Sequence, residues 1–242
     1  MFKFLKKIMN KEELISNVEV NSVHRILKTD IKKDPNTQED EIIFGCGCFW
    51  GAEKCFWKLP GVVTTSVGYA GGEKDNPNYY EVCSGLTGHS EVVRVIWDKT
   101  KIDISDLLKM FWECHDPTQK NRQGNDMGTQ YRSAIYYKNA NNLKTILASK
   151  AQYQTELNKK NLASIETEIK MIDAYFYAEQ YHQQYLASAG SSQYCSASPT
   201  KIKLGVFTGS NYKLKDNIWD NFNWEVDKCV LRSDNNPIEN NL

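Results

Sequence analysis

The alternation of strand-like and helix-like segments between residues 41 and 187 is the feature that most restricts the fold of this chain. Short runs rich in Val, Ile, Tyr and Phe predict strands at residues 41–44, 62–69, 91–97, 133–137 and 169–172. Apolar residues at helical spacing predict helices at residues 49–59, 105–112, 140–160 and 178–187, the second of them capped by Ser105. Because strands alternate with helices, the sequence predicts an α/β or α+β fold with one central sheet covered by helices, and it leaves the strand order open.

The two ends of the chain lack this alternation. Residues 1–40 are polar and irregular and predict an N-terminal extension with at most one short helix, preceded by a frayed or amphipathic lead-in at residues 1–10. Gly, Ser and Asn are scattered through residues 188–242, which predicts a long loop-rich C-terminal segment. The length of 242 residues therefore suits one large domain with tails, and a monomer is the expected state.

Charge and hydropathy exclude several classes of function. Lys and Arg together number 30, as do Asp and Glu, so no net charge draws the protein to nucleic acid or to an anionic membrane. No apolar run approaches the roughly 18 residues of a membrane span. The lysines near Met1 are followed by neither a long apolar stretch nor a small-residue cleavage site, so the cytoplasm is the expected location.

Cys48 is the strongest candidate for a chemically active residue. It lies between a predicted strand and a predicted helix and is flanked by Gly47 and Gly51, which allow a sharp turn. The first N–H groups of a helix favour an anion, so we expect the pKa of Cys48 to be lowered and the thiolate to be populated. Phe49 and Trp50 add an apolar wall beside the sulfur. This local pattern fits a buried structural cysteine equally well.

Further motifs extend the pattern around Cys48. They read GCFWGAE (47–53), GYAGG (68–72), NPNY (76–79), EVCSG (81–85), TGHSEVV (87–93), FWE (111–113), HDPTQ (115–119), RQGND (122–126), GTQYRSAIY (128–136) and YHQQYL (181–186). In this order they resemble the A-type peptide methionine sulfoxide reductases, and the resemblance covers about residues 41–195. The resemblance implies a two-layer sandwich with a ferredoxin-like core and a mixed sheet. It also implies reduction of the S epimer of methionine sulfoxide, free or in proteins.

The resemblance assigns the chemistry to three residues. Cys48 is the nucleophile and becomes a sulfenic acid, and Cys195 matches the position that resolves it as a disulfide. Glu91 opens an apolar strand, where burial favours the protonated carboxyl that can donate to the sulfoxide oxygen. On pattern alone, Glu91 is more simply a solvated glutamate at a strand end. The resemblance further implies reduction of the disulfide by thioredoxin, with no metal or organic cofactor.

Substrate binding is assigned in the same way. Tyr79 and Tyr131 resemble the tyrosines that hydrogen-bond the sulfoxide oxygen, and a phenol suits this role because it donates without carrying charge. Phe49 and Trp50 are expected to hold the methyl group. Asp126 matches an aspartate that orients or hydrates the site, although loop aspartates often only make turns.

The other cysteines have less certain roles. Cys46 is either a local resolver or, more simply, a small residue at a strand end, and Cys229 is either a second relay thiol or inert. Packing positions are expected for Cys55, Cys83 and Cys114. Structural hydrogen bonds are expected for His89, His115 and His182, and His24 is expected to be solvated.

Three other functions are compatible with parts of the sequence. A thiol hydrolase with His182 as its base leaves Glu91 and Cys195 unused. A non-catalytic module that binds methionine-rich peptides gains nothing from a thiol facing an acid. A zinc site lacks paired ligand spacings, and Cys46, Cys48, Cys114 and His115 would meet only by folding. We therefore expect an extension at 1–40, a catalytic reductase domain at 41–196 that includes Cys195, and a tail at 197–242.

Overall fold

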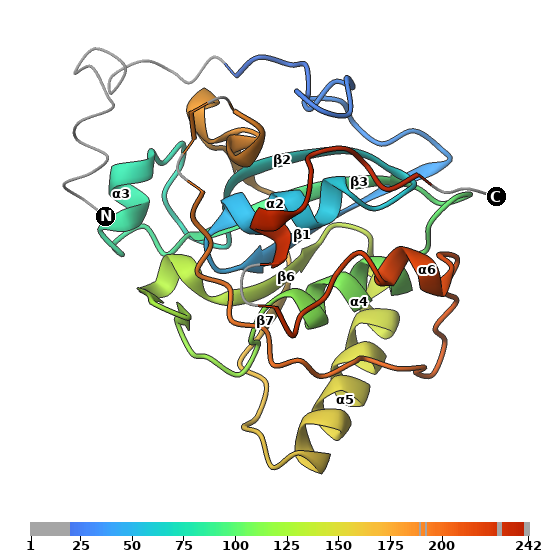
Figure 1. The fold of residues 1–242 in the computed structure, drawn as a ribbon. Helices are drawn as coiled ribbons and strands as arrows, with labels where there is room; N and C mark the ends of the chain where they lie inside the picture. Colours follow the sequence, from blue (N-terminus) through green and yellow to red (C-terminus); the bar gives the residue numbers. More distant parts are fainter. Residues whose placement is uncertain (1–19, 189, 192, 227–228, 240–242) are drawn as a thin grey trace.

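The computed structural model describes residues 20–188, 190–191, 193–226 and 229–239, so the predicted lead-in at residues 1–10 lies outside the described residues. At its centre lies a six-stranded sheet with the strand order β7-β6-β1-β3-β2-β8 (Figure 1). The strands are β1 (Glu39–Cys46), β2 (Val62–Ala70), β3 (Ser90–Asp98), β6 (Ser133–Tyr137), β7 (Glu168–Met171) and β8 (Tyr175–Tyr177). Only β6 and β7 pair in parallel, so the sheet is mixed.

Two crossovers build the core of this sheet. The first runs from β1 through α2 (Phe49–Trp57) to β2, and the second from β3 through α4 (Ile104–Cys114) to β6. The antiparallel order β6-β1-β3-β2 that results is the split βαβ arrangement of a ferredoxin-like core. The helix α5 (Leu143–Lys159) packs beside α4. The predicted fold class, a sheet covered by helices, is confirmed.

The two faces of the sheet follow the alternation of side chains along each strand. In β1, Ile42 and Phe44 join the large core under α2 and α4, whereas Ile43 packs on the opposite face. There the buried Arg94 pairs with Glu41 at 2.6 Å and donates to the carbonyl of Ile31. The described part of the N-terminal extension therefore covers this second face.

The expectation that His24 is solvated is wrong. His24 is fully buried, and its Nε2 lies 2.9 Å from the hydroxyl of Thr65. Its Nδ1 accepts from the backbone N–H groups of Ile26 and Leu27, so the ring closes a local turn. The ring also packs edge-on against Trp57. Burial lowers the pKa of His24 to about 3, which keeps the ring neutral.

The C-terminal segment runs past α4 first, and its last part crosses over α2 (Figure 1, red). It contains two short helices, α6 (Asp216–Trp219) and α7 (Cys229–Arg232). Its buried apolar side chains join the main core: Leu204, Phe207, Leu214, Ile218, Phe222, Trp224 and Val230. Near the end, Lys54, Trp57 and Lys58 donate to backbone carbonyls of residues 233–236. Side chains of α2 and of its C-cap residue Lys58 therefore anchor residues 233–236.

Several short elements differ from the prediction. The helix α3 (Tyr79–Cys83) lies between the predicted strands at 62–69 and 91–97, where no helix was predicted, and Asn78 and Glu81 form its capping box. A hairpin of β4 (Arg122–Gln123) and β5 (Asp126–Met127) lies between the predicted helix at 105–112 and the predicted strand at 133–137. Two 3₁₀ turns replace the predicted helix at 178–187. The N-cap of α4 is Asp103, not Ser105, because the Asp103 carboxylate accepts from the Ser105 N–H at 2.9 Å.

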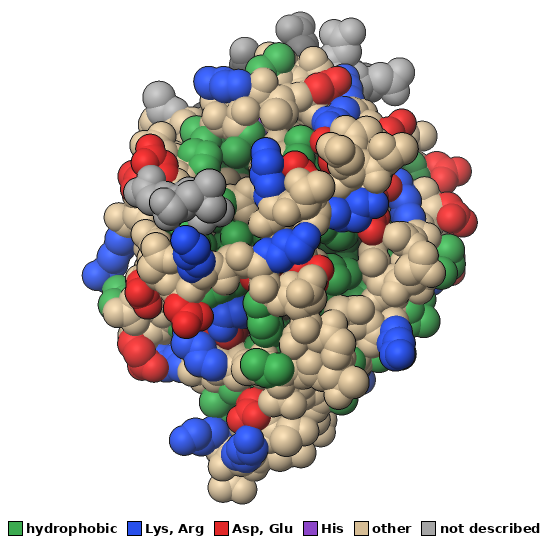
Figure 2. Space-filling view, turned by 90° about the vertical axis from the view of Figure 1, so that its right-hand side faces the viewer, with side chains coloured by type: hydrophobic (Ala, Val, Ile, Leu, Met, Phe, Trp, Pro, Cys, Tyr) green, Lys and Arg blue, Asp and Glu red, His purple; other side chains and the backbone are tan. Residues whose placement is uncertain are grey.

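The surface mixes charges of both signs. Figure 2 shows a face on which basic and acidic side chains lie interspersed among apolar ones. Within the described residues, no helix has both the length and the apolar character needed to span a bilayer.

Candidate active site

The topology gathers the predicted site residues at one end of the sheet. β1 and β2 end there, while β3 and β6 begin there, as the pairs Cys46–Ser133 and Ala70–Ser90 show. Cys48 follows β1, and Glu91 is the second residue of β3. Because antiparallel neighbours expose opposite chain ends at the same edge, residues far apart in sequence meet here.

The turn that carries Cys48 requires glycine. Gly47 has φ +85°, and a Cβ there would lie 2.5 Å from the Cβ of Gln123, so no larger residue fits. The Gln123 amide in turn accepts from the N–H groups of Asp116 and Ser198, which ties the turn to the loop after α4 and to the tail. Cys48 is the N-cap residue of α2 and is half-buried; its sulfur lies near the backbone N–H of Trp50 but makes no capping hydrogen bond.

The electrostatics of Cys48 differ from the expectation of a lowered pKa. Burial raises the pKa of Cys48, and the negative charge of Glu91 raises it further, whereas the nearby Trp50 N–H opposes both. The helix terminus stabilises the thiolate and so lowers the pKa of Cys48, but in this site desolvation raises that pKa by more. The resting thiol is therefore neutral, and it ionises more readily when the neighbouring carboxyl is protonated.

Glu91 meets that condition near neutral pH. Its side chain is buried, and its Oε2 accepts from the backbone N–H of Phe49 at 3.2 Å. Burial raises the pKa of Glu91 to about 8, the Phe49 bond opposes this rise, and the charges of Asp126 and Glu179 add to it. Near pH 7 most molecules thus hold a neutral carboxyl beside the Cys48 thiol.

A group of aromatic rings surrounds the residues after Cys48. The indole of Trp50 stacks on Tyr185 with ring centroids 3.8 Å apart, and its Nε1 donates to Nδ1 of His182 at 3.0 Å. The His182 ring also lies against Phe49 and Tyr79, at 5.0 and 4.7 Å between centroids. Burial lowers the pKa of His182 to about 3, so this ring is neutral and packs as an aromatic spacer.

Two polar residues that the sequence did not identify fix this aromatic group. The Glu179 carboxylate accepts from the Tyr69 hydroxyl and from the Tyr79 N–H, both at 2.8 Å. The side-chain amide of Gln183 accepts from the N–H of Val67 and donates to its carbonyl, so it pairs with the backbone of β2 as a neighbouring strand would. Both residues lie in the predicted helix at 178–187, and Gln183 belongs to the motif YHQQYL, but neither feature gives any sign of these long-range contacts.

The remaining substrate-binding candidates lie around Glu91. Tyr79 and Tyr131 are both buried. Burial raises the pKa of each phenol, and the negative charge of Glu91 raises it further. Asp126 is buried as well, and its Oδ1 accepts from the Tyr194 hydroxyl at 2.7 Å. Its Oδ2 has no hydrogen-bond partner among the described residues. Tyr194, the neighbour of Cys195, was not among the predicted site residues.

Cys195 packs on the helix that begins at Cys48. A Cβ at Gly51 would lie 2.6 Å from the Cys195 Sγ, so the missing side chain of Gly51 makes room for this sulfur. Burial raises the pKa of Cys195 to about 12, and the Ala197 N–H opposes the rise. Gly51 lies three residues after Cys48, so Cys195 packs against the first turn of the helix that begins at Cys48. Both are free thiols in this structure.

A cavity beside Gly51 is lined by Cys195 and four of the other cysteines: Cys46, Cys55, Cys114 and Cys229. Cys55 and Cys114 are buried, as expected for packing positions; Cys46 is buried too, and Cys229 is half-buried. Cys83, expected to be buried, is also half-buried and hydrogen-bonds the Tyr79 side chain.

A thiol beside a buried neutral carboxyl, with a second thiol against the same helix, defines a cysteine-dependent oxidoreductase. Comparison with known proteins gives the family. The model of the family "Peptide methionine sulfoxide reductase" matches residues 40–213. The peptide methionine sulfoxide reductase MsrA of Vibrio vulnificus is 52% identical over 183 residues, covering 76% of this chain and 87% of that protein. The MsrA of Ectopseudomonas mendocina is 52% identical over 181 residues, covering 75% and 82%.

Solved structures agree with the sequence comparison. Methionine sulfoxide reductase A of Corynebacterium diphtheriae has a TM-score of 0.65 at 37% identity and covers 82% of this chain and 98% of that chain. The reduced form of Mxr1 from Saccharomyces cerevisiae has a TM-score of 0.60 at 35% identity, covering 73% and 96%. The chain belongs to the peptide methionine sulfoxide reductase family. The predicted enzyme class and the thiol-dependent reduction of methionine sulfoxide are confirmed.

Proposed function

We propose that this enzyme reduces the S epimer of methionine sulfoxide through Cys48, resolves the oxidised cysteine with Cys195, and is recycled by thioredoxin. The observation that carries the proposal is the pairing of Cys48 with a buried carboxyl whose pKa of about 8 keeps it protonated near neutral pH. A proton donor and a nucleophile side by side are what sulfoxide reduction needs, since oxygen leaves as sulfur is attacked.

The substrate is held by opposite walls of the site. The sulfoxide oxygen lies toward Glu91, Tyr79 and Tyr131, which donate hydrogen bonds without bringing a positive charge. The methyl group lies against Phe49 and Trp50, whose rings are fixed by His182 and Tyr185. Fixed donors for oxygen beside a fixed apolar wall for methyl select one epimer at sulfur, because the other exchanges these two groups.

The first step transfers the sulfoxide oxygen to Cys48. The sulfur of Cys48 attacks the sulfoxide sulfur while Glu91 donates a proton to the sulfoxide oxygen. Methionine leaves and Cys48 becomes a sulfenic acid; the proton of the Cys48 thiol replaces the one that Glu91 gave. The substrate sulfur is reduced by two electrons and the Cys48 sulfur is oxidised by two. A protonated Glu91 serves twice, because it donates to oxygen and ceases to oppose ionisation of the thiol.

The second step resets the nucleophile. The thiol of Cys195 attacks the Cys48 sulfenic acid, a disulfide forms and water leaves. Cys195 rests against Gly51, on the first helical turn after Cys48, so only a short movement of the segment around it is required. Thioredoxin, a dithiol protein, then reduces the disulfide, and no metal or organic cofactor takes part. A reducing compartment such as the cytoplasm suits seven free cysteines in a monomeric enzyme.

The geometry disfavours a thiol hydrolase with His182 as its base. The His182 Nδ1 is engaged by the Trp50 indole, and its pKa of about 3 makes the ring a weak proton acceptor.

The proposed function is tested by supplying separated epimers of a methionine sulfoxide peptide. With thioredoxin, its reductase and NADPH, we expect the S epimer to be converted completely and the R epimer to remain. Replacing thioredoxin by its variant without active-site cysteines should stop turnover after the first equivalent. Equal consumption of both epimers would contradict the proposed pocket, and absence of any methionine would favour a peptide-binding module.

A further inference from the structure

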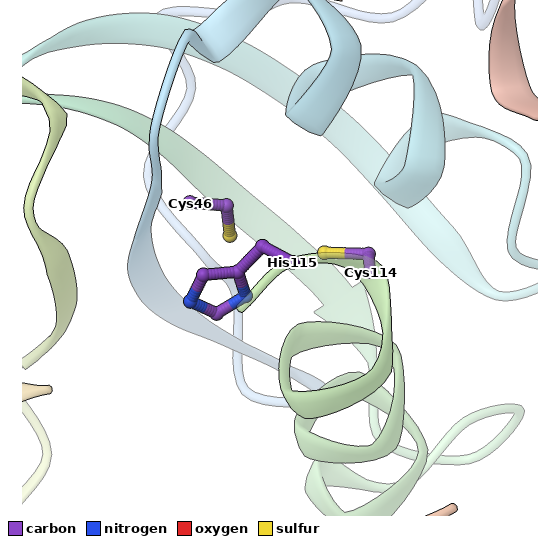
Figure 3. A group of neighbouring side chains, drawn as sticks. All are labelled: Cys46, Cys114 and His115. Atoms are coloured by element: carbon purple, nitrogen blue, oxygen red, sulfur yellow. The ribbon is translucent and has the colours of Figure 1, made fainter. Parts of the chain in front are cut away.

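Three side chains that the proposed mechanism does not use converge beneath the active-site turn. Cys46 ends β1, Cys114 ends α4, and His115 follows as the C-cap of that helix. One donor atom of each lies within 4.8 Å of the others (Figure 3). All three are buried, and in Figure 3 the two sulfurs point into the space beside the imidazole.

The sulfur atoms of Cys46 and Cys114 lie within 4.8 Å of each other, and the Cys55 thiol on α2 is near Cys114. The Cys114 thiol donates to the carbonyl of Phe111 at 3.5 Å. These three cysteines also line the cavity beside Gly51. A thiol is a weak hydrogen-bond donor, so little is lost when the thiol protons are displaced.

The donor set and its spacing fit a thiophilic divalent cation. Zinc binds thiolate at about 2.3 Å and imidazole at about 2.0–2.1 Å, which separates tetrahedral donors by roughly 3.5–3.8 Å. The observed donors lie within 4.8 Å, so they need to close by about 1 Å. Two thiolates balance a double positive charge and a neutral imidazole adds none, which matters in a buried site.

The hydrogen bonds of His115 allow it to act as a ligand. One ring nitrogen, Nδ1, lies 2.7 Å from the Phe111 carbonyl, and Nε2 lies 2.8 Å from the Ser133 hydroxyl. Because a carbonyl only accepts, Nδ1 carries the ring proton and Nε2 accepts from the Ser133 hydroxyl. Nε2 can bind a cation in place of this hydroxyl, which keeps a second partner in Thr167 at 2.7 Å, while Nδ1 still donates to Phe111, as is usual for histidine ligands.

We propose that Cys46, Cys114 and His115 form a binding site for a thiophilic divalent cation such as Zn²⁺ or Cd²⁺, with Cys55 beside the fourth position. Binding displaces the two thiol protons, which pass to solvent, and no residue is oxidised or reduced. The bound cation joins the end of β1 to the end of α4 and therefore stabilises the folded chain.

The test must separate this site from the catalytic pair, since Cys48 and Cys195 together can also chelate a cation. The starting protein is therefore the reduced, chelator-treated Cys48→Ser/Cys195→Ser variant, titrated anaerobically with Cd²⁺. We expect one Cd²⁺ per chain, a thiolate-to-cadmium absorption band and a raised Tm. Two displaced protons predict that the apparent affinity falls by up to about 100-fold for each pH unit of acidification.

Further substitutions in this double variant locate the site. Cys46→Ala or Cys114→Ala should each weaken Cd²⁺ binding at least about 100-fold, since even outer partners of metal ligands contribute 10–100-fold. The matched control, Cys229→Ala, removes a thiol from the same cavity and should leave the affinity unchanged. X-ray absorption at the cadmium edge needs no further variant and should show at least two sulfur neighbours and one nitrogen.

Three results would overturn the proposal. The first is failure of the Cys48→Ser/Cys195→Ser variant to bind Cd²⁺ while the parent binds it, which would assign the cation to the catalytic thiols. The second is an unchanged affinity in the alanine variants. The third is a bound cadmium surrounded by oxygen neighbours alone.

Discussion

Replacing Cys48 by serine is expected to abolish methionine formation, with a loss of at least about 10⁴-fold in the rate of the first turnover. A hydroxyl at this position is a far weaker nucleophile than a thiol, and serine has no sulfur that could be oxidised to a sulfenic acid. The measurement is methionine released from an S-sulfoxide peptide by a slight excess of enzyme without reductant. Trapping with a sulfenic-acid reagent should label the parent transiently and the Cys48→Ser variant not at all.

The matched control is Cys195→Ser, which makes the same chemical change in the other predicted redox cysteine. This variant should still release one methionine per chain, because its nucleophile is intact, and should then accumulate the Cys48 sulfenic acid. With thioredoxin it should fail to turn over repeatedly. If both variants released methionine, or if neither did, the assignment of nucleophile and resolver would be wrong.

Glu91→Gln is expected to slow the first turnover by about 10²–10⁴-fold, the usual range for a general acid. The glutamine keeps the size of the side chain and its ability to accept from the Phe49 N–H, but it has no acidic proton to give. In the parent, the single-turnover rate should fall as the pH rises through about 8, because Glu91 then loses its proton. The variant should lack this alkaline limb; a limb of unchanged position would assign it to another group.

The unfolding temperature of the Glu91→Gln variant shows whether its loss of activity results from misfolding. The pKa of Glu91 is raised from 4.5 to about 8 in the folded chain, so the folded state holds more protons than the unfolded state between these values. The contribution of Glu91 to stability is complete below about pH 4.5 and is lost as the pH rises through about 8. At pH 8 the Glu91→Gln variant should therefore unfold at a temperature no lower than the parent, although its activity is much lower.

Much of the fold was predictable because its long elements are strongly patterned. The strands at 62–69 and 91–97 and the helix near 105–112 are present, since their apolar residues face a single large core. The short elements were missed for the opposite reason. The five residues of α3 depend on the capping box of Asn78 and Glu81, and the 3₁₀ turns at 178–187 depend on contacts with distant strands.

The candidate site was predictable from residue types and not from its electrostatics. The fold brings Cys48, Glu91 and Cys195 together, as the motifs indicated. The expected lowering of the Cys48 pKa was wrong because the helix terminus is visible in sequence while the burial that opposes it is not. His24 was misplaced for a similar reason: nothing in a polar extension indicates that a distant Thr65 will bury it.

The residues that hold the site's aromatic side chains in position could not be predicted from the sequence. Glu179 acts through hydrogen bonds to Tyr69 and to the backbone of Tyr79, each about a hundred residues away. The approach of Cys46, Cys114 and His115 likewise results from the crossing of β1 and α4, because these residues have no ligand spacing in the sequence.

The most direct test of the central claim is a map of cysteine pairing after one turnover. The reduced enzyme is mixed with a slight excess of S-methionine sulfoxide peptide without reductant, alkylated, digested and analysed by mass spectrometry. The account predicts a disulfide between Cys48 and Cys195 together with at least one methionine per chain. A disulfide from Cys48 to Cys46 or Cys229 would contradict the proposed resolver, and free thiols throughout with no methionine would contradict the reductase mechanism itself.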